Sequence, residues 1–211
     1  MKAATIYILA VLLAQLTATL FIPLPIFGAV AVGTFIFGVT FTQRDHMHRH
    51  GKPFVYKIIF LAAALSLLLL LWIGWSVGES LSGFFANRDW GAFSNWLSEG
   101  YTLLSQSSWR VFLASVIAII IAESMDTEVY HQLRDRSWMV RVLRSNAVSV
   151  PTDSILFNVI AFAGVFSPSL LIKVTIGEIV VKALVSVGYA YLAQPKEPEP
   201  GASTTQAPKE A

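Results

Sequence analysis

Apolar residues run along the chain in six long stretches, and polar residues gather between them. Each stretch is close to the roughly 20 residues that an α-helix needs to cross a bilayer. Prolines or polar segments separate the stretches, and proline interrupts a helix. The pattern predicts an all-α membrane protein, a bundle of six transmembrane helices, over Thr5–Ile22, Ile26–Phe41, Phe54–Val77, Trp109–Tyr130, Val150–Phe166 and Leu170–Leu192.

The connection between the third and fourth stretches, residues 78–108, is longer and more polar than the others. It contains Trp90, Trp96 and Tyr101, and aromatic rings prefer the membrane–water interface. We therefore expect a short interfacial helix there. The tail, residues 193–211, is rich in Pro, Glu and Ser and is expected to be disordered, which leaves residues 1–192 as one transmembrane domain.

Composition agrees with this pattern. Hydrophobic residues make up 55% of the chain and charged residues 13%, about half the charged share of a soluble domain. The absence of cysteine excludes a thiolate metal site and a cysteine nucleophile. No serine elbow, zinc-helix motif or phosphate loop occurs, so we expect neither an enzyme nor a bound cofactor, and no nucleic-acid partner.

Basic residues predict the orientation. Arg44, Arg49 and Lys52 lie between the second and third stretches, and residues 134–144 supply four arginines between the fourth and fifth. Loops rich in arginine and lysine stay on the cytoplasmic side, so both termini are expected there, in a multi-pass protein of the inner membrane. A cleaved signal peptide is the alternative interpretation of the first stretch.

Carboxylates inside apolar stretches are the main candidates for a site. One such group costs about 2.5–3.5 kcal/mol at mid-bilayer, so it requires a partner, water or a ligand. Glu123, Asp126 and Tyr130 share one helical face, and Asp153 is predicted at a similar depth to Asp126. Asp126 could instead pair with a loop arginine, and Asp153, after Pro151, could mark a helix start.

The last stretch holds Glu178 and Lys182 at i, i+4, the favourable order for an intrahelical pair. They serve either as a structural ion pair or as part of a site. Asn158 is a candidate polar lining residue. Asp45, at the exit of the second stretch, is either a site residue or a solvated charge, and Asp45 and Glu123 are the candidates for ion coupling.

Two other patterns have plain interpretations. His46, His48 and His50 alternate in a basic loop, where contact with anionic lipid is favoured over a metal site, so no metal is expected. Ala10, Ala14 and Ala18 form a ridge of small residues that lets helices pack closely. Internal packing is the default; docking of a second copy or of a transport partner is the alternative.

With these residues in view, the chain resembles the VUT family of queuosine-precursor transporters, which are vitamin-uptake-like proteins. The resemblance rests on four segments between Phe35 and Ser186: FIFGVTFTQRD, MDTEVYHQLR, SNAVSVPTDSILF and GEIVVKALVS. It implies six helices and import of 7-deazaguanines such as preQ0 or preQ1. The substrate-binding residues are then expected to be Asp126, Asp153, Asn158, Glu178, Lys182, Tyr130 and Phe41.

Two rival functions stay open. The chain could be a substrate-capture subunit of a multi-component vitamin importer, which would dock its partner through the alanine ridge. It could also be a membrane enzyme built on the histidines and acidic residues, in which case the purified protein would contain metal.

Overall fold

The computed structural model describes residues 2–69 and 75–192, and most of these residues are helical. The remainder of the described chain consists of one hairpin and short connections. In chain order the elements are α1 (Lys2–Leu16), β1 (Phe21–Leu24), β2 (Gly28–Ala31), α2 (Val32–Met47), η1 (His48–His50), α3 (Lys52–Leu69), α4 (Trp75–Ala86), α5 (Ala92–Gln132), α6 (Trp138–Phe162) and α7 (Pro168–Leu192).

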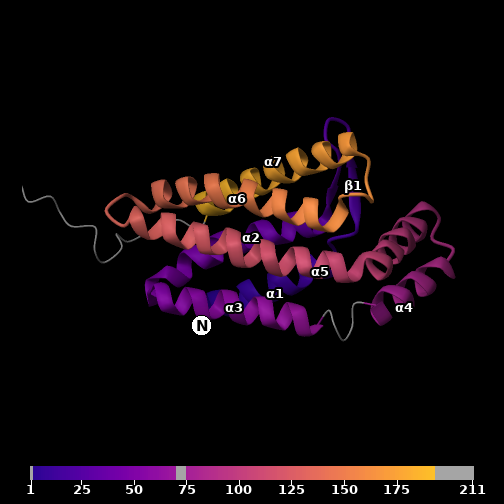
Figure 1. Cartoon of the computed structure of the whole chain (residues 1–211), viewed down its shortest axis with the longest axis horizontal. Helices are drawn as coiled ribbons and strands as arrows, with labels where there is room; N and C mark the ends of the chain where they lie inside the picture. Colours follow the sequence, from indigo (N-terminus) through magenta and orange to yellow (C-terminus); the bar gives the residue numbers. More distant parts are fainter. Residues whose placement is uncertain (1, 70–74, 193–211) are drawn as a thin grey trace, which may run out of the picture.

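The long helices run back and forth between two ends of the molecule (Figure 1). One end holds the hairpin, α4 and the turn from α6 to α7. The opposite end holds η1 and the turn from α5 to α6. Contacts between these last two segments confirm their proximity, because His48 Nδ1 lies 3.1 Å from His131 Nε2. The two basic loops therefore share one end of the bundle.

The predicted stretches fall on α1, α2, α3, α5, α6 and α7, but the starts of the fourth and fifth helices were predicted far too late. α5 is 41 residues long and begins at Ala92, far before Trp109. α6 begins at Trp138 and contains Pro151 in its interior. Packing of α6 along α5 outweighs the hydrogen bond that Pro151 removes. The prediction that Asp153 stands at a helix start is therefore wrong, because it lies in the middle of α6.

Residues 21–31 form an antiparallel hairpin where two helix ends were expected. Phe21 pairs with Ala31 and Leu24 with Gly28. Pro23 cannot donate a helical hydrogen bond, and Gly28 has a φ of 74°, which glycine adopts without strain. The protein is thus mostly helical with one small two-stranded sheet.

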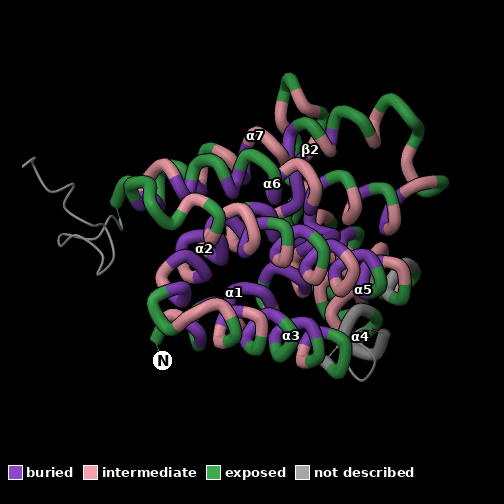
Figure 2. The backbone as a smooth tube through the Cα atoms, turned by 60° about the vertical axis from the view of Figure 1, so that its left-hand side comes forward, coloured by how far each residue is buried: buried purple, intermediate pink, exposed green. Residues whose placement is uncertain are grey.

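Much of α1 and α2 is buried within the bundle (Figure 2). The two backbones approach so closely that a Cβ at Gly33 would overlap the Ala14 carbonyl oxygen. Ala10, Ala14 and Ala18 are all buried. Their burial favours internal packing, the default interpretation, over docking of a partner on these three residues.

Among the described residues, no helix combines the length and the apolar character that crossing a bilayer requires. A short helix, α4, is present in the segment where one was expected between the third and fourth stretches. The predicted disorder of residues 193–211 concerns residues outside the described ranges.

Candidate functional site

A pocket opens between α1, α2, α5, α6 and α7, on the inner faces of these helices. Its empty volume is about 430 Å³, counting the part that is open to solvent. Small residues of α1, α2 and α5 border the space, aromatic rings reach into it from α2 and α6, and charged side chains reach into it from α6 and α7. The lining includes Gln15, Phe37, Ser115, Asp153, Phe157, Glu178 and Lys182.

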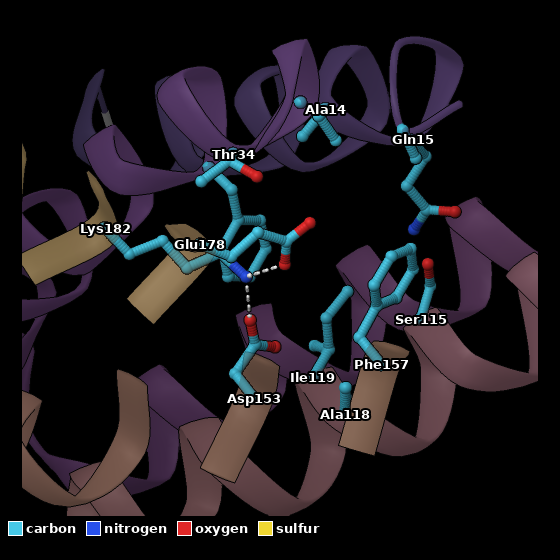
Figure 3. A pocket seen from close by; sticks show the side chains of 14 residues that line it. Ala14, Gln15, Thr34, Ser115, Ala118, Ile119, Asp153, Phe157, Glu178 and Lys182 are labelled. Carbon is cyan, nitrogen blue, oxygen red and sulfur yellow. Dashed lines mark hydrogen bonds and ion pairs between the residues drawn. The ribbon is translucent and has the colours of Figure 1, made fainter. Parts of the chain in front are cut away.

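Lys182 stands at the charged side of the pocket, between two carboxylates (Figure 3). Its Nζ lies 2.8 Å from Asp153 Oδ2 and 3.4 Å from Glu178 Oε2. Asn158 Nδ2 donates to the same Glu178 oxygen over 2.9 Å. All four side chains are buried. The group carries two negative charges against one positive charge, so the pocket favours a ligand that brings positive charge or N–H donors.

Gln15 reaches into the pocket from α1, on the side away from Lys182 and near Ser115 (Figure 3). The side chain is buried, yet neither its amide oxygen nor its amide nitrogen has a hydrogen-bond partner among the described residues. The same is true of Glu178 Oε1. A buried polar group without a partner costs free energy, so these atoms mark places where a ligand would complete the hydrogen bonding.

A second polar cluster surrounds Arg44 of α2, which is fully buried. The guanidinium contacts Glu123 Oε2 at 2.7 Å, Asp126 Oδ1 at 2.9 Å and, more weakly, Asp45 Oδ1 at 3.7 Å. Ser149 of α6 donates to Asp126 Oδ1 over 2.9 Å. We call these residues the Arg44 cluster. It joins α2, α5 and α6 through charge-assisted hydrogen bonds, which are stronger than neutral ones.

The Arg44 cluster lies beside the pocket along the same helices. Glu123 is one helical turn beyond the pocket residue Ile119 on α5, and Ser149 is one turn before Asp153 on α6. Along α2, Arg44 follows Phe37 by two turns, toward the end that holds the basic loops. The cluster thus lies next to the pocket on the side of η1.

Aromatic rings lie around the Arg44 cluster, on the side of η1. The Tyr130 ring stacks on His48, with centroids 4.2 Å apart, and the Arg141 guanidinium lies 3.9 Å from the same ring. Phe41 packs edge-on against Phe37. Burial, together with the nearby Arg44 charge, lowers the pKa of His48 to about 2, so its imidazole is neutral.

The structure divides the residues that the sequence singled out. Asp153, Glu178 and Lys182 line the pocket, and Asn158 holds Glu178 from behind. The described structure does not place Asp126, Tyr130 or Phe41 in the lining. Asp126 lies in the Arg44 cluster with Asp45 and Glu123, and its partner is Arg44 rather than an arginine of the 134–144 loop. The Glu178–Lys182 pair forms as expected, and Asp153 joins it.

Two residues of these sites were missed from the sequence. Gln15 is the only amide or charged residue in the first apolar stretch, which was a usable signal. Arg44 was read as a loop residue that marks orientation. α2, however, extends to Met47, and the residue is therefore inside the bundle.

The charged pocket lies between the helices of a mostly helical bundle, a place where small-molecule binding sites commonly occur. The family can be stated as well. Residues 31–193 match the family model described as "Putative vitamin uptake transporter", and the chain belongs to this transporter family. It is therefore not an enzyme, and the family implies a place in a membrane.

The chain also matches an individual curated protein. The chain is similar to a Bacillus subtilis (strain 168) protein named "Probable queuosine precursor transporter", with 32% identity over 93 residues. The match covers 40% of this chain and 41% of the relative, so it spans about two fifths of either protein. No solved structure matches the chain.

Proposed function

We propose that this protein is a secondary transporter that imports queuosine precursors, 7-deazaguanine bases such as preQ0 and preQ1. The family membership and the printed name of the Bacillus subtilis relative support the substrate class. The observation that carries the proposal is the pocket itself, in which two buried carboxylates face one ammonium group and three polar atoms lack partners.

The unpartnered atoms suit the edge of a guanine-like base. Such an edge presents adjacent N–H donors and a carbonyl oxygen. An ionised carboxylate only accepts hydrogen bonds, so Glu178 accepts from the N–H donors of the base. An amide offers both a donor and an acceptor, so Gln15 pairs with an edge of the base that presents both kinds of group. The rings of Phe157 and Phe37 offer flat apolar faces on which a base stacks. Asn158 keeps Glu178 in place.

Lys182 sets the charge preference of the site. Without substrate it sits between Asp153 and Glu178. The amine of preQ1 is cationic, so it pairs with Asp153 and compensates the excess negative charge of the pocket. We therefore propose that preQ1 binds more tightly than the neutral preQ0, and that both enter the same pocket.

We propose further that the bundle is embedded in the inner membrane, with six crossings and both termini cytoplasmic. Large apolar side chains point outward from α1 and α7, among them Leu9, Leu13, Leu184 and Ile172. In this placement the basic loops face the cytoplasm, the hairpin faces the opposite side, and α4 lies at the interface. Lipid then covers the outward apolar surface.

The Arg44 cluster is our proposed closing layer on the cytoplasmic side. Asp126, Tyr130 and Phe41 belong to this layer rather than to the substrate contacts. Its carboxylates Asp45 and Glu123 are the groups we assign to ion coupling, because they are buried and contact Arg44. Release of substrate into the cell requires this layer to separate.

Uptake by cells tests the proposal. Cells that cannot synthesise preQ0 and lack their own carrier are supplied with labelled preQ0 or preQ1. The protein should restore accumulation, and Glu178→Gln and Asp153→Asn should each reduce it at equal membrane abundance. Glu99→Gln is the matched control, because Glu99 is exposed on α5, away from the pocket; this variant should accumulate normally.

Normal uptake by a Glu178→Gln, Asp153→Asn double variant would remove these carboxylates from the mechanism. The rival function is a substrate-capture subunit, and burial of the alanine ridge argues against docking through these residues. Transport by the purified protein alone in liposomes would exclude it. Co-purification with an ATPase module, combined with inactivity alone, would favour it over our proposal.

A further inference from the structure

Three potential metal ligands lie close together beside Arg44. Asp45 of α2, His48 of η1 and Asp126 of α5 each offer one ligand atom, and these atoms lie within 4.8 Å of one another. All three residues are at least nine-tenths buried, with relative exposures of 0%, 7% and 0%. They come from two segments far apart in the sequence.

The free atoms are what distinguishes this group from an ordinary ion-pair cluster. Neither oxygen of Asp45 accepts a hydrogen bond from any described residue, and the same holds for Asp126 Oδ2 and for His48 Nε2. His48 Nδ1 is occupied by His131, so Nε2 is the nitrogen left for a ligand. Buried acceptors that face one another with no donor between them are unfavourable unless a cation joins them.

The net charge of the Arg44 cluster also favours a bound cation. Asp45, Glu123 and Asp126 bring three carboxylates, and Arg44 is the cation that contacts all of them. With all three carboxylates ionised, one negative charge remains in excess even when Arg141, which stacks on Tyr130, is counted. An additional cation therefore lowers the electrostatic cost of the cluster.

We propose that Asp45, His48 and Asp126 form a binding site for one divalent transition-metal ion of the Zn²⁺, Co²⁺ or Mn²⁺ type. One imidazole with two carboxylates is a ligand set for these ions, whereas Mg²⁺ and Na⁺ select oxygen alone. The proposal is independent of the transported substrate, because it concerns residues outside the pocket.

The three ligands must draw closer together for an ion to bind. Metal–ligand bonds in such sites are about 2.0–2.2 Å, so two ligand atoms at a tetrahedral angle on one ion lie about 3.5 Å apart. Atoms at the 4.8 Å limit therefore approach each other by roughly 1.3 Å. The contact from His48 to His131 orients the imidazole, as an outer hydrogen-bond partner of a metal-bound histidine commonly does. The ion would tie the end of α2 to α5.

Metal binding to the purified full chain tests this inference, in the absence of substrate and with any affinity tag removed. The protein is stripped with a chelator and titrated with Zn²⁺, Co²⁺ or Mn²⁺ alone. We expect about one ion per chain and a rise in the melting temperature on loading. His48→Gln and Asp45→Asn should weaken binding by more than the roughly 10–100-fold that loss of an outer partner costs; His131→Gln should fall within that range.

His50→Gln is the matched control, because His50 lies in the same short helix but is exposed. It should bind metal as the unchanged chain does. If Asp45→Asn does not fold, His48→Gln with a normal apo melting curve decides alone. Absence of stoichiometric metal binding, or an equal loss of metal affinity in His50→Gln and His48→Gln, would overturn the site. Protonation of the cluster or adventitious metal binding at the surface would then explain the observations. Substrate binding by the pocket is measured separately, because none of these residues lines it.

Discussion

Lys182 is the residue whose charge allows Asp153 and Glu178 to share one buried pocket. It is the cation that bridges both carboxylates. Removal of one partner from a buried ion pair leaves a charge without compensation, which costs about 3–5 kcal/mol. The position therefore links stability and ligand recognition, and the two effects can be separated by substitution.

We predict that Lys182→Met lowers the free energy of unfolding by about 3–5 kcal/mol, measured by denaturant unfolding of the purified protein. Lys182→Met combined with Asp153→Asn should recover part of that loss, because one of the uncompensated charges is then removed. Lys173→Met, on the same helix but exposed, should change stability little. An equal effect at both lysines would mean that the ion pairs do not hold α6 to α7.

Gln15 allows the opposite test. Its amide is buried without a partner, so replacing it with an apolar side chain of similar size removes a cost rather than an interaction. We predict that Gln15→Leu leaves the melting temperature unchanged or raises it, while the affinity for preQ1 falls about tenfold, as expected when one hydrogen-bonding group of roughly 1.4 kcal/mol is lost. Lost stability with unchanged affinity would make Gln15 a structural residue.

Among the helices, close packing of α1 against α2 contributes to the stability of the fold. α1 and α2 touch through the Ala14 backbone and Gly33, where no side chain fits. Gly33→Ala should therefore push the two helices apart and lower stability by about 1–3 kcal/mol. Gly188→Ala in α7 is the control, because a methyl group there meets nothing within 4 Å, and alanine favours a helix over glycine. Thermal unfolding of both variants checks the prediction, and a stable Gly33→Ala variant would refute it.

Helix positions could be predicted from the sequence because apolar runs of this length leave few alternatives. Helix ends could not: whether Pro151 ends α6 depends on packing against α5. The Glu178–Lys182 pair was accessible because both partners lie on one helix. Arg44 and Glu123 are 79 residues apart, and nothing local connects them. Gln15 shows the converse, since a polar residue in an apolar run was visible but its role depends on the helices around it.

Orientation belongs to the whole molecule. The basic loops and the hairpin lie at opposite ends of the bundle (Figure 1), and our proposed membrane placement puts these ends on opposite sides. The chain has no native cysteine, so single cysteines can be introduced cleanly. We predict that a cysteine at Ile26, which is 78% exposed in the hairpin, reacts with an impermeant thiol reagent in intact cells.

A cysteine at Arg136, exposed in the loop between α5 and α6, should react only after the membrane is permeabilised. Both variants must first restore uptake, so that the labelled molecules are active ones. Labelling of both positions from the same side would contradict the six-crossing placement.

Binding of preQ1 to the purified protein tests the central claim most directly, because it needs no energy source and no partner. Isothermal titration should give one site per chain, tighter for preQ1 than for preQ0, and binding should be abolished or strongly weakened in Glu178→Gln but unchanged in Glu99→Gln. Equal affinity in Glu178→Gln and the unchanged protein, or no binding of either base, would contradict a substrate site built on these carboxylates.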